Sequence, residues 1–314
     1  MSWYAQAPSN IALIKYMGKK SEGINIPTNP SLSYTLNQLI SSVELASYDG
    51  KDDRWEPLII PGAAEFKLST PSQERFLRHL TNIKSKFNYT GSFIVRSNNN
   101  FPHSTGLASS ASSFAALTKC AALALSDLTQ TPMPSVDIQS AWSRAGSGSS
   151  CRSFYSPWAM WDEEDVTLIE LPYPELRHEV IVISSDEKKI SSSEAHRRVS
   201  TSPLYPRRHI RASENLAELL YAFHARNWQE AYQICWREFQ DMHELFETCA
   251  TPFSYMTDKT HQVLRSLQAE WKKLGDGPLV TMDAGPNIHL LYRPDQKEMA
   301  NKFKENYLDC TYDA

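Results

Sequence analysis

Residues 101–111, with the sequence FPHSTGLASSA, constrain the fold more than any other stretch of this chain. Pro102 disfavours a helix at the start of the stretch, and Gly106 permits a tight turn with positive φ. The small side chains at 109–111 leave backbone N–H groups accessible, and an Ala-rich helix is predicted to continue to Leu125. Because the N-terminus of a helix attracts phosphate, the pattern indicates a phosphate-binding loop.

The same stretch admits a simpler interpretation, because a serine-capped loop without a ligand has the same composition. It is not a Walker loop, since no Gly-Lys-Ser/Thr sequence follows the first glycine. If the loop does bind phosphate, the hydroxyls of Ser109 and Ser110 could add hydrogen bonds to its oxygens or coordinate Mg²⁺.

The 314 residues can bury a sizeable core and suit two domains or one large domain. The formal net charge of -4 argues against a general nucleic-acid or anionic-membrane surface, but is compatible with a locally basic pocket. Five cysteines without close spacing indicate neither a disulfide framework nor a zinc site. The chain starts without a signal-peptide pattern, and no apolar run approaches the ~20 residues of a membrane span, so we expect a cytoplasmic protein.

Two lysines stand at the end of a predicted buried strand, IALIKY at residues 11–16. Lys15 and Lys19 lie on either side of the strand end, where their ammonium groups could approach a polyanion. Two solvated surface lysines would give the same pattern, so spacing alone leaves both interpretations open.

A Gly/Ser run, GSGSSCR at residues 146–152, follows a helix predicted over residues 135–145. Its glycines and serines expose N–H and O–H donors. The planar guanidinium of Arg152 can hold a carboxylate or a phosphate through two parallel hydrogen bonds. Taken alone, a Gly/Ser run is more often a plain linker than a binding loop.

The stretch LVTMDAGPNIHLLY at residues 279–292 is predicted to form two strands joined by a turn that begins at Asp283. Asp, Gly, Pro and Asn all favour turns by themselves, so composition alone does not make Asp283 functional.

Periodicity predicts helices over residues 72–86, 213–226, 227–249 and 261–274. Asn227 followed by Glu230 resembles a capping pair at a helix start. One apolar stripe in the third of these helices is interpreted as core, and it comprises Cys235, Phe239, Met242 and Phe246.

Four motifs together resemble a known family. The Pro-x-x-x-Gly-Leu-x-Ser-Ser-Ala stretch is similar to the ATP loop of the galactokinase, homoserine kinase, mevalonate kinase and phosphomevalonate kinase (GHMP) superfamily. Asn-Ile-Ala-Leu-Ile-Lys-Tyr-x-Gly-Lys, Arg-x-Gly-Ser-Gly-Ser-x-x-Arg and Met-Asp-Ala-Gly-Pro-Asn narrow the resemblance to the diphosphomevalonate decarboxylases. The likeness runs from about Ala7 to Tyr292. The chain departs from the family at Met17, usually tryptophan, and at Ser156 and Pro157, usually a glycine pair.

The resemblance implies an α+β, two-domain GHMP kinase fold with its site in the interdomain cleft. A ribosomal-S5-domain-2-like ATP-binding domain would span residues 1–185, and a ferredoxin-like domain residues 186–314. It also implies an enzyme that uses ATP and Mg²⁺ to phosphorylate the 3-hydroxyl of mevalonate 5-diphosphate, which then loses phosphate and CO₂ to give isopentenyl diphosphate. A homodimer is expected because relatives commonly form one.

The resemblance also assigns roles to individual residues. Catalytic roles fall to Asp283, Arg152 and Lys15. Substrate contacts are expected from Asn10, Tyr16, Lys19, Arg75, Ser147, Gly148, Ser149 and Ser193. ATP contacts are expected from Ser97, Thr105, Gly106, Leu107, Ala108, Ser109 and Ser110, with Ser109 also a ligand for Mg²⁺.

Three alternatives stay open from the sequence. A sister enzyme could act on mevalonate monophosphate, or it could stop after 3-phosphorylation as a kinase. Asp283 together with Arg152 disfavours the pure kinase. A non-catalytic sensor of ATP or of an isoprenoid precursor would be expected to lose Asp283, Lys19 or Arg152, and all three are present.

Overall fold

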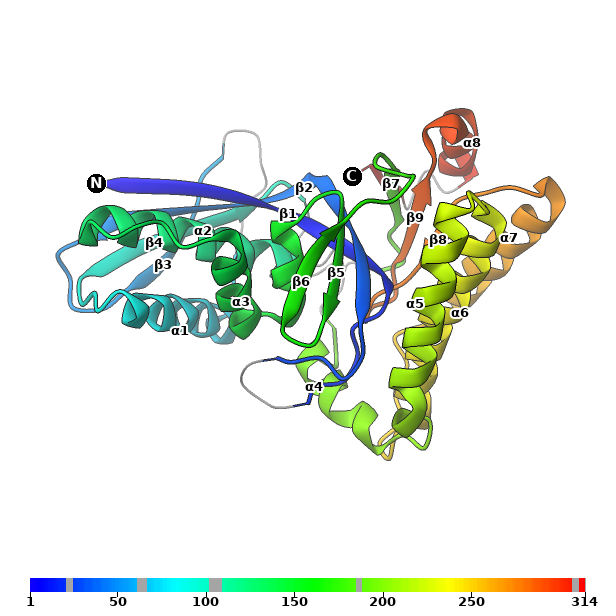
Figure 1. The fold of residues 1–314 in the computed structure, drawn as a ribbon, viewed down its shortest axis with the longest axis horizontal. Helices are drawn as coiled ribbons and strands as arrows, with labels where there is room; N and C mark the ends of the chain where they lie inside the picture. Colours follow the sequence, from blue (N-terminus) through cyan, green and yellow to red (C-terminus); the bar gives the residue numbers. More distant parts are fainter. Residues whose placement is uncertain (21–24, 61–66, 102–108, 185–187, 307–310, 314) are drawn as a thin grey trace.

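The computed structural model describes residues 1–20, 25–60, 67–101, 109–184, 188–306 and 311–313. Their elements form two β-sheets, each with its own helices, arranged along the length of an elongated molecule (Figure 1). The expectation of a mixed α and β fold is therefore confirmed.

The first sheet is organised around one long strand, β2 (Ser31–Tyr48). Its first residues pair with β5, its later residues pair with β4, and β1 runs antiparallel along nearly its whole length. The strand order is β3-β4-β2-β5-β6, with β1 paired to β2. The other strands are β1 (Ser2–Ile14), β3 (Arg54–Pro57), β4 (Ser92–Asn99), β5 (Trp158–Asp162) and β6 (Asp165–Ile169).

Three α-helices of the described residues accompany this sheet and make up the first half of the molecule with it. Figure 1 shows them together at the end of the molecule that holds the N-terminus. They are α1 (Thr70–Lys86), α2 (Ser109–Thr129) and α3 (Val136–Gly146). The predicted Ala-rich helix is α2, which buries Phe114, Leu117 and Leu125 against Val43 and Val95 of the sheet. Its many alanines leave room for the helix to approach the strands closely.

The second sheet has the strand order β10-β7-β9-β8, with antiparallel pairing throughout. Its strands are β7 (Arg177–Ile181), β8 (Leu279–Thr281), β9 (Ile288–Tyr292) and β10 (Thr311–Asp313). Helices separate β7 from β8 and β9 from β10, which is the βαββαβ arrangement of a ferredoxin-like domain. The strand–turn–strand prediction around Asp283 corresponds to β8 and β9.

The two sheets divide between β6 and β7, on the N-terminal side of the boundary expected after residue 185. Strand β7 pairs with β9 from Arg177 to Ile181. An apolar strand at residues 180–183 can be predicted from the sequence, but pairing partners far away in the chain decide which sheet it joins.

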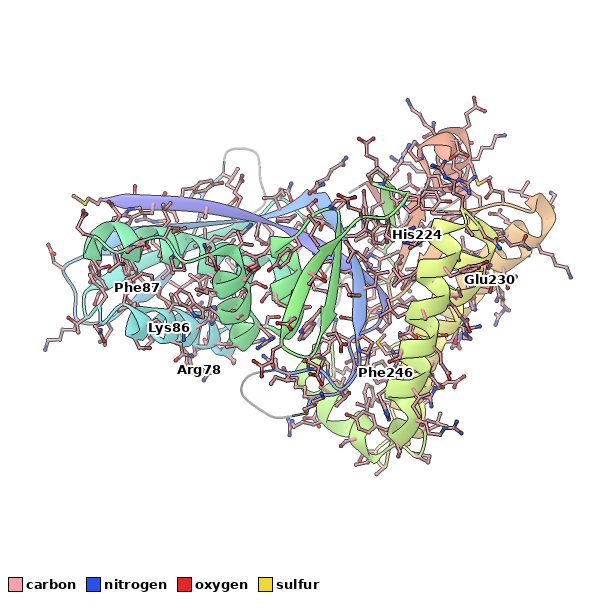
Figure 2. All side chains as sticks on the ribbon, viewed as in Figure 1. Arg78, Lys86, Phe87, His224, Glu230 and Phe246 are labelled. Carbon is pink, nitrogen blue, oxygen red and sulfur yellow. The ribbon has the colours of Figure 1, made fainter. Side chains whose placement is uncertain are left out.

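In the part of the chain that the structure describes, the second half of the molecule, from β7 onward, holds five α-helices: α4 (Ser192–Arg198), α5 (Arg208–His224), α6 (Trp228–Thr248), α7 (Asp258–Leu274) and α8 (Lys297–Asn306). The side chain of Asn227 accepts a hydrogen bond from the Glu230 N–H at 3.1 Å, which confirms the capping pair. The predicted stripe on α6 is buried. Figure 2 shows α6 running from Glu230 to Phe246, while Arg78 and Lys86 of α1, and Phe87 directly after it, lie at the other end of the molecule.

A large apolar cluster of buried residues joins the two halves. Ile11 and Leu13 of β1 and Trp158 of β5 belong to the same cluster as Phe223 of α5 and Leu279 of β8. The rings of Trp158 and Phe223 have centroids 5.3 Å apart. Packing of this kind holds the halves in one arrangement, and it brings the end of β1 to the β8–β9 turn.

No helix in the described part of the chain is both long and apolar enough to cross a membrane.

Candidate active site

A cavity of about 470 Å³ lies where the two halves meet. Elements from both sheets contribute side chains to it, and most of the polar ones are lysine, arginine or serine. The first half contributes Ala12, Lys15, Tyr16, Met17, Lys19, Asn25, Arg75, Ser109, Ser110, Ala145, Gly146, Ser147, Gly148, Ser149 and Arg152. The second half contributes Lys188, Ser191, Ser192, Ser193, His196, Met242, Asp283 and Ala284.

An ion pair between Lys15 and Asp283 joins the halves at this cavity. The Lys15 Nζ lies 2.8 Å from the Asp283 Oδ1 and also donates to the carbonyl of Ala12 at 2.6 Å. The Asp283 side chain is 29% exposed and that of Lys15 only 2%, so the carboxylate faces the cavity and the ammonium lies behind it. A carboxylate in this position can orient a hydroxyl group or accept its proton.

The electrostatics keep the pair charged. Burial by itself raises the pKa of Asp283, but Lys15, His289 and Lys188 more than offset burial and hold this pKa below its usual value. Burial lowers the pKa of Lys15, and the negative charge of Asp283 opposes that change. Lys15 is therefore the main group that keeps the Asp283 carboxylate ionised.

The backbone of Lys15 is held by a buried charge network on the second half. Its N–H donates to Glu238 Oε1 at 2.8 Å, and its carbonyl accepts from Arg208 Nη2 at 3.1 Å. Arg208 and Glu238 also pair directly, and both side chains are almost fully buried. Asp241 holds the same guanidinium at 2.9 Å. The end of β1 is thereby fixed to α5 and α6.

Arg152 presents its guanidinium to the cavity from η1 (Gly148–Phe154), a 3-10 helix formed by the Gly/Ser run. Its Nε donates to Asn10 Oδ1 at 3.2 Å and its Nη1 to Ser31 Oγ at 2.9 Å. Its Nη2 makes no hydrogen bond to any residue that the structure describes. Two of the three nitrogens thus fix the group, and the third is available to an anion.

Tyr16 explains why a glycine stands at position 148. A Cβ on Gly148 would lie 2.7 Å from the Tyr16 ring and 2.8 Å from its hydroxyl oxygen. The Tyr16 hydroxyl is buried without a hydrogen-bond partner among the described residues, and burial raises its pKa, so it stays protonated. Tyr16 is therefore a neutral donor beside the Gly/Ser run.

His243 supports the turn that carries Asp283. Its Nε2 lies 3.2 Å from the Asp283 carbonyl oxygen, and its ring packs against Phe246 with centroids 5.3 Å apart. Burial lowers the pKa of His243 to about 3, so the ring is neutral and donates from Nε2.

Most of the residues expected at the site meet in this cavity. Twelve line it: Lys15, Tyr16, Lys19, Arg75, Ser109, Ser110, Ser147, Gly148, Ser149, Arg152, Ser193 and Asp283. Arg75 donates from Nε and Nη2 to the carbonyl of Gly146, at 3.2 and 2.6 Å. Thr105, Gly106, Leu107 and Ala108 fall outside the described residues.

Two expected residues do not line the cavity. Asn10 is buried behind it, where its amide donates to Ser153 Oγ at 2.8 Å and its Oδ1 accepts from Arg152. Its place in the structure is that of a support for Arg152. Ser97 lies on β4, and its hydroxyl accepts a hydrogen bond from Trp55 Nε1 at 2.8 Å.

Lys188, His196 and Met242 line the cavity although we did not expect them there from the sequence. Lys188 stands beside a second lysine and shortly before a serine run, and a polar stretch of this kind has no spacing pattern that singles it out. Its pKa is lowered by burial and raised by Asp283, so it lies within the field of that carboxylate. His196 gave no signal, because a single histidine in a short helix has no spacing pattern to read.

Among the residues that the structure describes, no three His, Cys, Asp or Glu side chains gather closely enough to hold a metal ion.

An enclosed carboxylate surrounded by lysine, arginine and serine, between two α/β halves, defines a site for a small anionic substrate. Comparison with known proteins agrees with this class. Residues 7–167 match the diphosphomevalonate decarboxylase-like N-terminal domain, and residues 179–312 match the mevalonate 5-diphosphate decarboxylase C-terminal domain. The chain therefore belongs to the diphosphomevalonate decarboxylase family, which confirms the resemblance carried by the four motifs.

Individual relatives agree over nearly the whole chain. A crystal structure of a mevalonate diphosphate decarboxylase from Legionella pneumophila is 60% identical, covers 98% of both chains and has a TM-score of 0.93. Diphosphomevalonate decarboxylase mvd1 of Aspergillus fumigatus is 31% identical over 93% of this chain and 77% of its own length. A structure of MDDEF in complex with MVAPP, AMPPCP and magnesium is 27% identical, covers 98% of this chain and 94% of its own, and has a TM-score of 0.85.

Proposed function

We propose that this chain catalyses the ATP-dependent decarboxylation of mevalonate 5-diphosphate to isopentenyl diphosphate. The observation that carries the proposal is that Asp283, paired with Lys15, and Arg152, held by Asn10 and Ser31, face one cavity. Membership in the diphosphomevalonate decarboxylase family supports the same reaction.

The first step transfers the γ-phosphoryl group of ATP to the tertiary 3-hydroxyl of the substrate. Asp283 orients this hydroxyl and takes its proton as the new O–P bond forms. The lowered pKa of Asp283 makes it a weak base, which suits a loose transition state in which the proton leaves late. Lys15, Lys19 and Lys188 offset the negative charge that the diphosphate, the carboxylate and ATP bring together.

The second step breaks two bonds of the 3-phosphorylated substrate. The C3–O bond breaks and inorganic phosphate leaves, and the bond to the carboxylate carbon supplies the electron pair of the new double bond as CO₂ leaves. Arg152 holds the carboxylate in line for this cleavage through its available Nη2. Met17, Met242 and Ala284 give the cavity an apolar portion, in which CO₂ is released without solvation by donors.

The Ser109 and Ser110 hydroxyls fit the ATP and Mg²⁺ end of the site. They line the cavity at the first turn of α2, and they offer oxygen atoms to a hard cation that takes few protein ligands. Bound Mg²⁺ would neutralise part of the charge on the transferring phosphate.

We also infer that the protein is a homodimer and acts in the cytoplasm. Analytical ultracentrifugation would test the first inference, and cell fractionation the second.

The proposal is tested by identifying products. The purified protein is incubated with ATP, Mg²⁺ and either mevalonate, its 5-phosphate or its 5-diphosphate, and products are followed by ³¹P NMR and CO₂ release. The 5-diphosphate is expected to yield isopentenyl diphosphate, ADP, phosphate and CO₂ in equal amounts. Faster turnover of the monophosphate, a 3-phosphate without CO₂, or binding without turnover would each replace the proposal by the corresponding alternative.

A further inference from the structure

Among the described residues that line the cavity, His196 is a histidine with a defined tautomer and no part in the reaction described above. It lies on α4 of the second half, and its Nδ1 is 3.0 Å from the backbone nitrogen of Gly18 in the first half. A backbone N–H can only donate, so Nδ1 must be the acceptor. The proton of the neutral ring is therefore on Nε2.

The surroundings keep the ring neutral. Burial, with a smaller effect from the Lys19 charge, lowers the pKa of His196 to about 3. The ring packs on Tyr16 with centroids 4.4 Å apart. The hydrogen bond from the Gly18 N–H to His196 requires a glycine at position 18. Its φ of +102° suits glycine, and a Cβ there would lie 2.4 Å from both Thr28 and Tyr205.

The Nε2–H of His196 has no acceptor among the residues that the structure describes. The residue is only partly buried, and it lines the cavity, so a ligand can reach the ring there. Its neighbours are a lysine, the protonated hydroxyl of Tyr16, and Ser192 and Ser193 on the same helix. Each of these groups can donate a hydrogen bond and none of them carries a negative charge, so together with the Nε2–H they fit an anionic oxygen.

We propose that His196 is a substrate-positioning residue, and that its Nε2–H donates to a phosphate oxygen of the substrate's diphosphate. The inference rests on the proposed function for the identity of that substrate. A phosphate oxygen is favoured over the substrate carboxylate because Arg152, held on the opposite half by Asn10 and Ser31, is the group built to grip the carboxylate. His196 supplies a hydrogen bond without adding another positive charge to a site already rich in lysine.

Two amide substitutions separate the two roles of the ring. In His196→Asn the amide oxygen replaces Nδ1 as acceptor for Gly18, but the distal donor is lost. In His196→Gln the amide nitrogen replaces the Nε2 donor, while the acceptor for Gly18 is lost. The matched control is His209→Asn, because His209 is exposed on α5 and does not line the cavity.

Steady-state kinetics with mevalonate 5-diphosphate then distinguish the roles. His196→Asn is expected to raise the KM for this substrate about 10- to 100-fold, as loss of a hydrogen bond to a charged group does, with kcat and the KM for ATP little changed. His196→Gln is expected to recover most of the binding, and His209→Asn to match wild type. Wild-type KM in His196→Asn, or loss in His196→Gln alone, would show that only the contact with Gly18 matters.

A second measurement observes the histidine rings of the wild-type protein directly. In ¹⁵N-histidine spectra of the wild-type protein, one Nε2–H signal should shift when mevalonate 5-diphosphate is added without ATP. The signal is assigned by its absence in the His196→Gln spectrum. An unshifted signal at saturating ligand overturns the inference. If wild type instead turns over another phosphorylated acid, the proposed function fails separately, and the same variants are compared on that acid.

Discussion

At the scale of single residues, the Asp283 carboxylate keeps its charge although protein surrounds it, because the Lys15 ammonium lies 2.8 Å away. The carboxylate in turn opposes the lowering of the Lys15 pKa by burial. The pKa of each group depends on the charge of the other, so the two groups act as a pair.

Replacing Asp283 with asparagine should remove turnover and leave binding. We expect kcat to fall about 10²- to 10⁴-fold, the range usual for loss of a general base or orienting acceptor. ATP and substrate affinities, measured by calorimetry, should change little because the amide is nearly isosteric. The control is Asp49→Asn at an exposed position. A kcat near that of wild type would remove Asp283 from the mechanism.

Replacing Lys15 with methionine should change the pH profile. Lys15 holds the pKa of Asp283 down, so its removal raises that pKa and leaves less carboxylate ionised at a given acidic pH. The acidic limb of kcat/KM should therefore move to higher pH. Lys20→Met provides a control, because Lys20 is exposed and pairs with Glu163. An acidic limb that stays in place in Lys15→Met would contradict the assignment.

At the scale of elements, helices α5 and α6 form a pair whose buried face carries charge. Arg208 of α5 and Glu238 of α6 hold the backbone of Lys15, and Asn215 donates to Glu238 Oε2 at 2.6 Å. On the outer face of the same two helices, Glu218 and Arg237 also pair, with both side chains about half exposed. The same kind of ion pair thus occurs in two different environments.

Glutamine substitutions on this pair of helices should differ in cost. Glu238→Gln leaves a buried guanidinium short of one partner, and we expect a loss of about 3 kcal/mol in the free energy of unfolding, with lower kcat as Lys15 shifts. Glu218→Gln, the matched control, should cost about 0–1 kcal/mol because water screens an exposed pair. Urea unfolding compares them, and equal losses would mean that the buried network has no special role.

At the scale of the whole molecule, the two halves share an apolar cluster and a cavity. The cluster includes Ile11, Trp158, Phe223 and Leu279, so separating the halves would expose apolar surface from both. The cavity takes Arg152 from one half and Asp283 from the other, which makes the site incomplete without either half.

We therefore expect the protein to unfold as one unit and to be stabilised by its substrate. Calorimetry should show one thermal transition. Mevalonate 5-diphosphate at about 100 times its Kd should add about 2.7 kcal/mol of stability, which corresponds to a rise of a few degrees in Tm. Arg152→Met should reduce the ligand-induced rise at the same ligand concentration. Two separate thermal transitions, of which the ligand raises the Tm of only one, would contradict a shared core.

Much of the secondary structure and part of the candidate site could be predicted from local sequence patterns. The helices at 72–86 and 227–249, the cap at Asn227 and the turn at Asp283 each depend on residues close together in the chain, and all are present in the structure. The place of β7 in the second sheet, the 3-10 helix of the Gly/Ser run, and the positions of Lys188 and His196 depend on distant partners and had no local signal.

The amino-acid sequence by itself contains the four motifs, and these motifs identify the family and indicate which residues contact an anionic substrate. Motifs can be recognised in sequence because they are short runs whose residue types are required together. Only the tertiary structure decided that Asp283 pairs with Lys15, that Asn10 supports Arg152 behind the cavity, and that His196 turns its Nδ1 to Gly18. These contacts join residues 268, 142 and 178 positions apart, and they exist only once apolar burial has brought the two halves together.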